Sequence, residues 1–133
     1  MAHRNDFQGI IATLQTPFNK DGSIDEQLFK ENTRKLATCG AQGVYCLGSS
    51  AEFFSISTEE HFRLTELFIN EMADKALKIV GCLSTGLQQM IDKARHAQAC
   101  GADAVFVTPP FVNPLNSAER LGAMRDVAAA CPE

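Results

Sequence analysis

The chain has 133 residues, of which 45% are hydrophobic and 21% charged, as expected for one soluble globular unit. Its formal net charge of -4 and the lack of any run of Lys or Arg argue against a surface that binds nucleic acid or anionic membranes. No apolar stretch approaches the roughly 18 residues that cross a bilayer, and no signal-type core follows residues 1–6, so we expect a cytoplasmic protein whose partner is a small molecule or another protein.

Four repeats of a strand followed by a helix are predicted along the chain. The strands are short apolar runs, expected at residues 8–16, 43–47, 78–83 and 104–108. Each is followed by an amphipathic pattern, and these predict helices at residues 25–39, 57–72, 87–98 and 116–131. Residues 57–60 (Ser-Thr-Glu-Glu) form a capping box that marks the start of the second helix, and Gly101 is predicted to end the third.

The five cysteines are predicted to be reduced thiols. They contain no CxxC pair and no zinc-like spacing, and the three histidines are predicted to be surface or helix-packing residues. We therefore expect neither a metal nor a cofactor. Cys46 and Cys82, near the ends of the second and third strands, are predicted to be small core residues.

Apolar strands that alternate with amphipathic helices predict an α/β fold with a parallel sheet. One possible architecture is an open flavodoxin-like sheet, which could close its core at this length. The other is a (β/α)8 TIM barrel, which needs eight strands and about 250 residues, so that this chain would cover about the first four βα units. The spacing of the elements does not separate the two.

Polar or special residues follow the carboxyl end of every predicted strand, where both architectures bind ligands. They are Thr16, then Gly48, Ser49, Ser50 and Glu52, then Ser84 and Thr85, then Thr108 and Phe111.

Several short motifs around these positions resemble those of one known family. In chain order they are Thr16-Pro17-Phe18, Asp-Gly-Ser-Ile-Asp at 21–25, Gly-Val-Tyr-Cys-Leu-Gly-Ser-Ser-Ala-Glu at 43–52, the capping box at 57–60, Gly-Ala-Asp-Ala at 101–104 and Thr-Pro-Pro-Phe at 108–111. Each is weak alone, but their ordered occurrence over the whole chain resembles the dihydrodipicolinate synthase and N-acetylneuraminate lyase family.

The resemblance implies a class I aldolase that binds pyruvate or another 2-keto acid as a Schiff base to a lysine and makes or breaks a carbon–carbon bond. It also implies a TIM barrel that assembles as a homo-oligomer, specifically a tetramer. Residues 1–133 would be the N-terminal half of that barrel, an incomplete domain. In the family, the residues that match Gly48, Ser49 and Ser50 bind the keto-acid carboxylate, and Ser49 would also join a proton relay. Backbone N–H groups and two short hydroxyls can cradle a carboxylate in this way.

Thr16 and Glu52 are expected to support the site, Glu52 by accepting backbone N–H bonds that anchor the loop. Ala51 stands where the family usually has glycine, which puts the loop geometry in question.

Phe111 stands where the synthase branch has a relay tyrosine, and a phenyl ring has no proton to pass, although it can still line the pocket or a dimer interface. Because Ser49 also replaces the usual threonine of that branch, we expect a sugar-acid or sialic-acid lyase rather than an ordinary dihydrodipicolinate synthase.

The Schiff-base lysine is not expected among these residues, because the family carries it on strand 6 and a second relay tyrosine on strand 5. Five of the six lysines are predicted on helices or turns and Lys78 at the start of a strand, and a helix surface does not desolvate an amine. These 133 residues alone are therefore expected to be inactive. They would belong to a longer polypeptide or pair with a second copy. The alternatives are a truncated, non-catalytic paralogue that binds a keto acid or a full-length partner, and an unrelated open-sheet binding domain.

Overall fold

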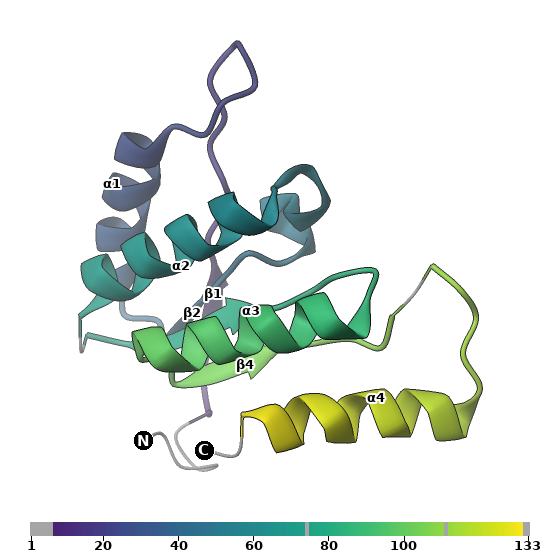
Figure 1. Cartoon of the computed structure of the whole chain (residues 1–133). Coiled ribbons are helices and arrows are strands. Elements are labelled where there is room, and N and C mark those ends of the chain that lie inside the picture. Colours follow the sequence, from purple (N-terminus) through teal and green to yellow (C-terminus); the bar gives the residue numbers. More distant parts are fainter. Residues whose placement is uncertain (1–6, 74, 111, 132–133) are drawn as a thin grey trace.

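The computed structural model describes residues 7–73, 75–110 and 112–131 and consists of strands and helices in strict alternation (Figure 1). The strands are β1 (Ile11–Thr13), β2 (Gly43–Cys46), β3 (Leu77–Gly81) and β4 (Ala104–Phe106). The α-helices are α1 (Glu26–Ala37), α2 (Thr58–Met72), α3 (Leu87–Cys100) and α4 (Ser117–Ala130). Two short 3-10 helices that the sequence did not predict, η2 (Ser49–Ala51) and η3 (Phe53–Ser55), lie between β2 and α2.

The four strands form one parallel sheet in the order β1-β2-β3-β4. Each strand therefore pairs with the next one along the chain, and a helix makes every crossover. A doubly wound open sheet instead reverses its strand order at a switch point. The consecutive order belongs to a (β/α)8 barrel and excludes the flavodoxin-like alternative.

One face of the sheet carries the core. Val44 and Cys46 from β2, Val80 from β3 and the following Cys82 are completely buried, and they pack with side chains from all four helices. Because side chains alternate between the two faces of a strand, the residues between them point to the opposite face. We call this opposite side of the sheet the open face. The prediction that Cys46 and Cys82 are core residues is confirmed, and burial raises the pKa of both thiols.

Two of the strands are shorter than the sequence predicted by two residues or more. β1 covers only Ile11–Thr13 of the expected residues 8–16, and β4 covers only Ala104–Phe106 of the expected residues 104–108. Both lie at the edges of the described sheet, so each has one neighbour to supply hydrogen bonds. Pro109 and Pro110 also lack the N–H groups that would extend β4.

The helix boundaries follow the signals in the sequence closely. Ser57 and Glu60 form the predicted capping box at the start of α2, and Asn116 and Glu119 form a second one at the start of α4. Gly101 ends α3 in the left-handed conformation, with a φ of 96°. None of the helices in the described ranges has the length and apolar character needed to span a membrane.

Candidate functional site

The loop after β2 presents two hydroxyl groups at the carboxyl end of the sheet. Gly48 is buried at the end of the strand, and the exposed Ser49 and Ser50 begin the 3-10 turn η2. Because these two residues begin the turn, their backbone N–H groups have no hydrogen-bond acceptor within it. Among the described residues no side-chain hydrogen bond occupies either hydroxyl, so both can bind a ligand.

Main-chain bonds fix the shape of this loop. The carbonyl of Gly48 accepts from the N–H groups of Ala51 (3.1 Å) and Phe53 (3.4 Å), and the carbonyl of Ser49 accepts from Glu52 (3.1 Å). Two non-glycine residues of this loop have a positive φ, Leu47 at 57° and Glu52 at 54°. Such angles are sparsely populated and often accompany functional loops.

Ala51 does not disturb this geometry. It is buried within η2 and is not among the residues with positive φ, because the left-handed angle falls on its neighbour Glu52. An alanine is therefore tolerated where the family usually has glycine.

The anchoring role expected for the Glu52 carboxylate is not what the structure shows. The side chain is exposed and makes no hydrogen bond to another described residue. Its main chain holds the loop instead, because its N–H donates to Ser49 and its carbonyl accepts from Ser55 (2.8 Å).

Tyr45 is a residue of this site that the sequence analysis missed. Val44 and Cys46 point to the helices, so Tyr45 lies on the open face, where its ring packs against Phe106 of β4 at a centroid distance of 5.1 Å. Its hydroxyl and ring lie directly against the α-carbon of Gly48. Burial raises the pKa of the Tyr45 phenol to about 12, so it is neutral at physiological pH. The continuous apolar run at residues 43–47 has no polar alternation that could have indicated this orientation.

Gly48→Ala should destabilise the protein by about 2 kcal/mol, because a Cβ at this position would collide with the Tyr45 ring and hydroxyl. The backbone of Gly48 has a negative φ of −90°, so the cost is steric and not conformational. In urea unfolding, the same substitution in a Tyr45→Val background should cost much less. Equal costs in the two backgrounds would contradict the proposed contact.

The remaining predicted site residues do not all gather at this loop. Thr16 follows β1 and is 7% exposed, and its hydroxyl has no hydrogen-bond partner within the described part of the chain. Thr108 is half-buried after β4. Phe111 lies outside the described residues. Ser84 is hydrogen-bonded to the Gln89 side chain at 2.5 Å and belongs, with Thr85, to a different cavity.

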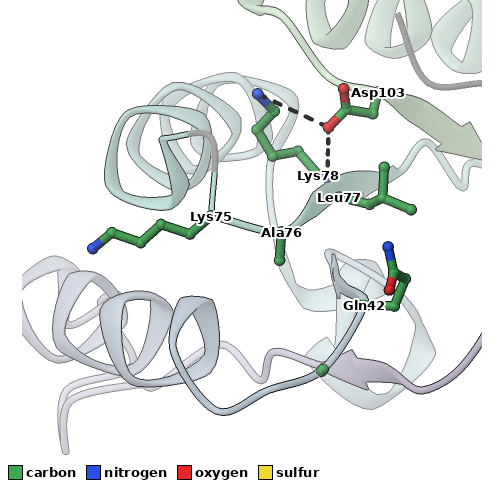
Figure 2. Close-up of a pocket in the computed structure, with 7 residues that line it drawn as sticks. Gln42, Lys75, Ala76, Leu77, Lys78 and Asp103 are labelled. Atoms are coloured by element: carbon green, nitrogen blue, oxygen red, sulfur yellow. Dashed lines mark hydrogen bonds and ion pairs between the residues drawn. The ribbon is translucent and has the colours of Figure 1, made fainter. Parts of the chain in front are cut away.

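A cavity of about 370 Å³ lies at the opposite end of the sheet, where β3 begins (Figure 2). Lys78 and Asp103 both line it and interact with each other. The Asp103 carboxylate accepts the Lys78 backbone N–H at 2.9 Å and lies 3.9 Å from the Lys78 ammonium. These contacts join β3 to the start of β4. In a barrel this end contributes stability and not catalysis, so we do not assign the active site to it.

The expectation that the helical lysines are surface residues is wrong for Lys93. Lys93 is on α3 but only 5% exposed, and its ammonium donates to the carbonyl of Leu83 at 2.9 Å. Burial lowers the pKa of its amine. The lysine side chain is long enough for its amine to reach the loop after β3, although the residue itself is on α3.

No cluster of three or more His, Cys, Asp or Glu side chains that could hold a metal ion occurs in the described ranges. The five cysteines are free thiols. The arrangement around residues 48–50 can bind an anion by hydrogen bonding.

Comparison with known proteins gives a consistent result. Residues 6–132 match the model of the dihydrodipicolinate synthetase family. The chain is 36% identical to a 4-hydroxy-tetrahydrodipicolinate synthase of Bartonella tribocorum over 80% of its own length and 36% of the length of that protein.

Solved structures agree with this match. A catalytic lysine mutant of a Ruminococcus gnavus sialic acid aldolase superposes with a TM-score of 0.91 at 25% identity, covering 99% of this chain and 43% of that one. An Escherichia coli prophage protein of the dihydrodipicolinic acid synthase family, solved in complex with pyruvate, superposes with a TM-score of 0.88 at 27% identity, covering 93% of this chain and 42% of that one. The chain thus spans less than half the length of these relatives.

Proposed function

The chain belongs to the dihydrodipicolinate synthetase family, and from that premise we propose that this protein is a Schiff-base-forming lyase or aldolase acting on pyruvate or another 2-keto acid. Two relatives support the proposal by what is known of them: the R. gnavus enzyme has a catalytic lysine, and the E. coli protein binds pyruvate. The chemistry would be formation of an imine between a lysine and the keto group, followed by cleavage or formation of the adjacent carbon–carbon bond.

The turn at residues 48–50 is the single observation that carries this proposal. Its two exposed hydroxyls and unpaired N–H groups lie at the carboxyl end of a parallel strand, where barrel enzymes bind their substrates. We assign Gly48, Ser49 and Ser50 to the substrate carboxylate. Ser49 would also pass a proton to or from the bound substrate. The neutral Tyr45 ring would form the wall beside Gly48.

Among members of the family, we favour a sugar-acid or sialic-acid lyase over a dihydrodipicolinate synthase. The preference rests on Ser49 in place of threonine and on Phe111 in place of the relay tyrosine. A phenyl ring at position 111 can line a pocket or an interface between subunits but cannot transfer a proton.

We further propose that these residues form the N-terminal half of the barrel, in a homo-oligomer. β1 and β4 each leave one edge without a partner strand in the described sheet. In a barrel, four more strands would pair with these edges and enclose the open face, which includes the 45% exposed Phe106. The Schiff-base lysine would then come from the second half.

Borohydride reduction of the native protein in the presence of pyruvate tests the proposal. We expect one covalent adduct per subunit, located by peptide mapping on a lysine other than the six at positions 20, 30, 35, 75, 78 and 93. An adduct on one of those six would contradict the assignment of the nucleophile. No adduct at all, with pyruvate still bound, would identify the protein as the non-catalytic paralogue instead.

A further inference from the structure

A second cavity, of about 320 Å³, lies outside the Gly48–Ser50 loop, between η3, the start of α2 and the loop from β3 to α3. Its apolar wall includes Phe53, Phe54 and Leu83, and its polar groups include Ser84 and Gln89. Lys93 is the only charged residue that lines it in the described part of the chain. The cavity therefore places a primary amine in a mostly uncharged pocket.

The surroundings of Lys93 increase the fraction of its amine that is neutral. The side chain is 5% exposed, and no carboxylate forms an ion pair with it among the described residues. Within the described ranges, its amine makes one hydrogen bond, to the carbonyl of Leu83. Cys82, the thiol after β3, raises the pKa of Lys93, and Lys93 in turn lowers the pKa of His61, the buried imidazole of α2. Desolvation is the larger influence and lowers the pKa of Lys93, although Cys82 opposes the change.

A neutral lysine amine has two N–H groups and one lone pair. One N–H can keep the hydrogen bond to Leu83 while the lone pair adds to an electrophile, and this bond is lost when the imine forms. Desolvation in an apolar pocket is one of the ways in which proteins activate a lysine as a nucleophile.

From this geometry we propose that Lys93 is a carbonyl-reactive site that forms an imine with a small neutral aldehyde in the cavity. It goes beyond the proposed lyase function, because it concerns a different lysine and a different cavity. In the reaction, the Lys93 nitrogen adds to the carbonyl carbon, and the carbinolamine then loses water. The two amine protons and the carbonyl oxygen leave as that water, and a C=N bond remains.

A neutral compound fits this cavity better than a keto acid. The start of α2 could attract a carboxylate, but Glu60 already lies there and accepts the Ser57 N–H at 2.8 Å. Ser57 and Thr58 line the cavity, so a substrate carboxylate would lie near that acidic residue without a second cation. The hydroxyl of a hydroxyaldehyde, by contrast, can bond to Ser84 or Gln89.

Reductive labelling of the native protein with glycolaldehyde and cyanoborohydride at neutral pH tests the proposal. The hydride reduces the C=N bond to a stable secondary amine, which peptide mass spectrometry locates. We expect Lys93 to be labelled severalfold faster than Lys35, an exposed lysine of α1, because a larger fraction of its amine is neutral. Labelling of Lys93 no faster than that of Lys35 would overturn the proposal.

Lys93→Gln provides the matched control, because the glutamine side chain is uncharged in the desolvated pocket, keeps an N–H donor and does not form an imine. Its urea unfolding midpoint should stay close to that of the wild type while the label at position 93 is lost. Pyruvate in place of glycolaldehyde should leave Lys93 unlabelled, and a pyruvate adduct there would overturn the requirement for a neutral compound. A pyruvate adduct on another lysine tests the lyase function separately, so the two proposals can fail independently.

Discussion

Replacing Ser49 and Ser50 together by alanine should weaken pyruvate binding about a hundredfold. Each hydroxyl would lose one hydrogen bond to a carboxylate, and such charge-assisted bonds contribute about 1.5 kcal/mol or more apiece. A total of about 3 kcal/mol corresponds to about two orders of magnitude in Kd. Calorimetric titration of the native protein and the double variant measures the difference directly.

Stability should not change in this variant, because both side chains are exposed and neither hydroxyl bonds to a described residue. Ser55→Ala is the matched control, since Ser55 is an exposed serine in the neighbouring turn η3. It should bind pyruvate as the wild type does. If the double variant binds as tightly as Ser55→Ala, the Gly48–Ser50 turn is not the carboxylate site.

Acid should destabilise the fold through His61. This residue of α2 is 1% exposed, and its Nε2 lies 2.8 Å from the carbonyl of Gly81. Nε2 must therefore carry the proton, which leaves Nδ1 buried without a hydrogen-bond partner in the described part of the chain. Burial is the main reason that the pKa of His61 falls from 6.5 to about 4; the nearby Lys93 and His96 also lower it, and the bond to Gly81 opposes the change.

Below pH 6.5 the unfolded chain takes up a proton on His61 that the folded protein does not accept. The stabilising contribution of the neutral imidazole is therefore complete above pH 6.5 and is lost as the pH falls towards 4, by up to about 3 kcal/mol. His61→Gln keeps a donor for Gly81 but cannot titrate. Urea unfolding from pH 7 to pH 4 should show a shallower loss of stability in this variant than in the wild type. Parallel curves would show that His61 does not contribute to the acid sensitivity.

Much of the fold could be predicted from the sequence because the signals that mark its helices and strands are local. The capping box at residues 57–60, the left-handed Gly101 and the apolar strand runs each mark an element by themselves. The ends of β1 and β4 could not be predicted in the same way, because a strand ends where its partner stops supplying hydrogen bonds. The choice between barrel and open sheet likewise depended on the strand order, which the spacing of elements does not contain.

The candidate site also combines features that local sequence signals predict with features that depend on contacts between segments. The position of Ser49 and Ser50 after β2 followed from the motif alone. The exposed carboxylate of Glu52, the Tyr45 ring against Gly48 and the buried amine of Lys93 depend instead on contacts between segments or on the rotamer of a long side chain. A helical periodicity assigns Lys93 to a helix, but it does not reveal that its amine lies beside the loop after β3.

We expect the turn at Gly48, Ser49 and Ser50 to bind the carboxylate of a 2-keto acid. A crystal structure of the native protein soaked with pyruvate tests this most directly. We predict the carboxylate within hydrogen-bond distance of both serine residues, with the keto carbon joined to a lysine from outside these four βα units. Pyruvate bound elsewhere, with Ser49 and Ser50 free of ligand, would contradict the account.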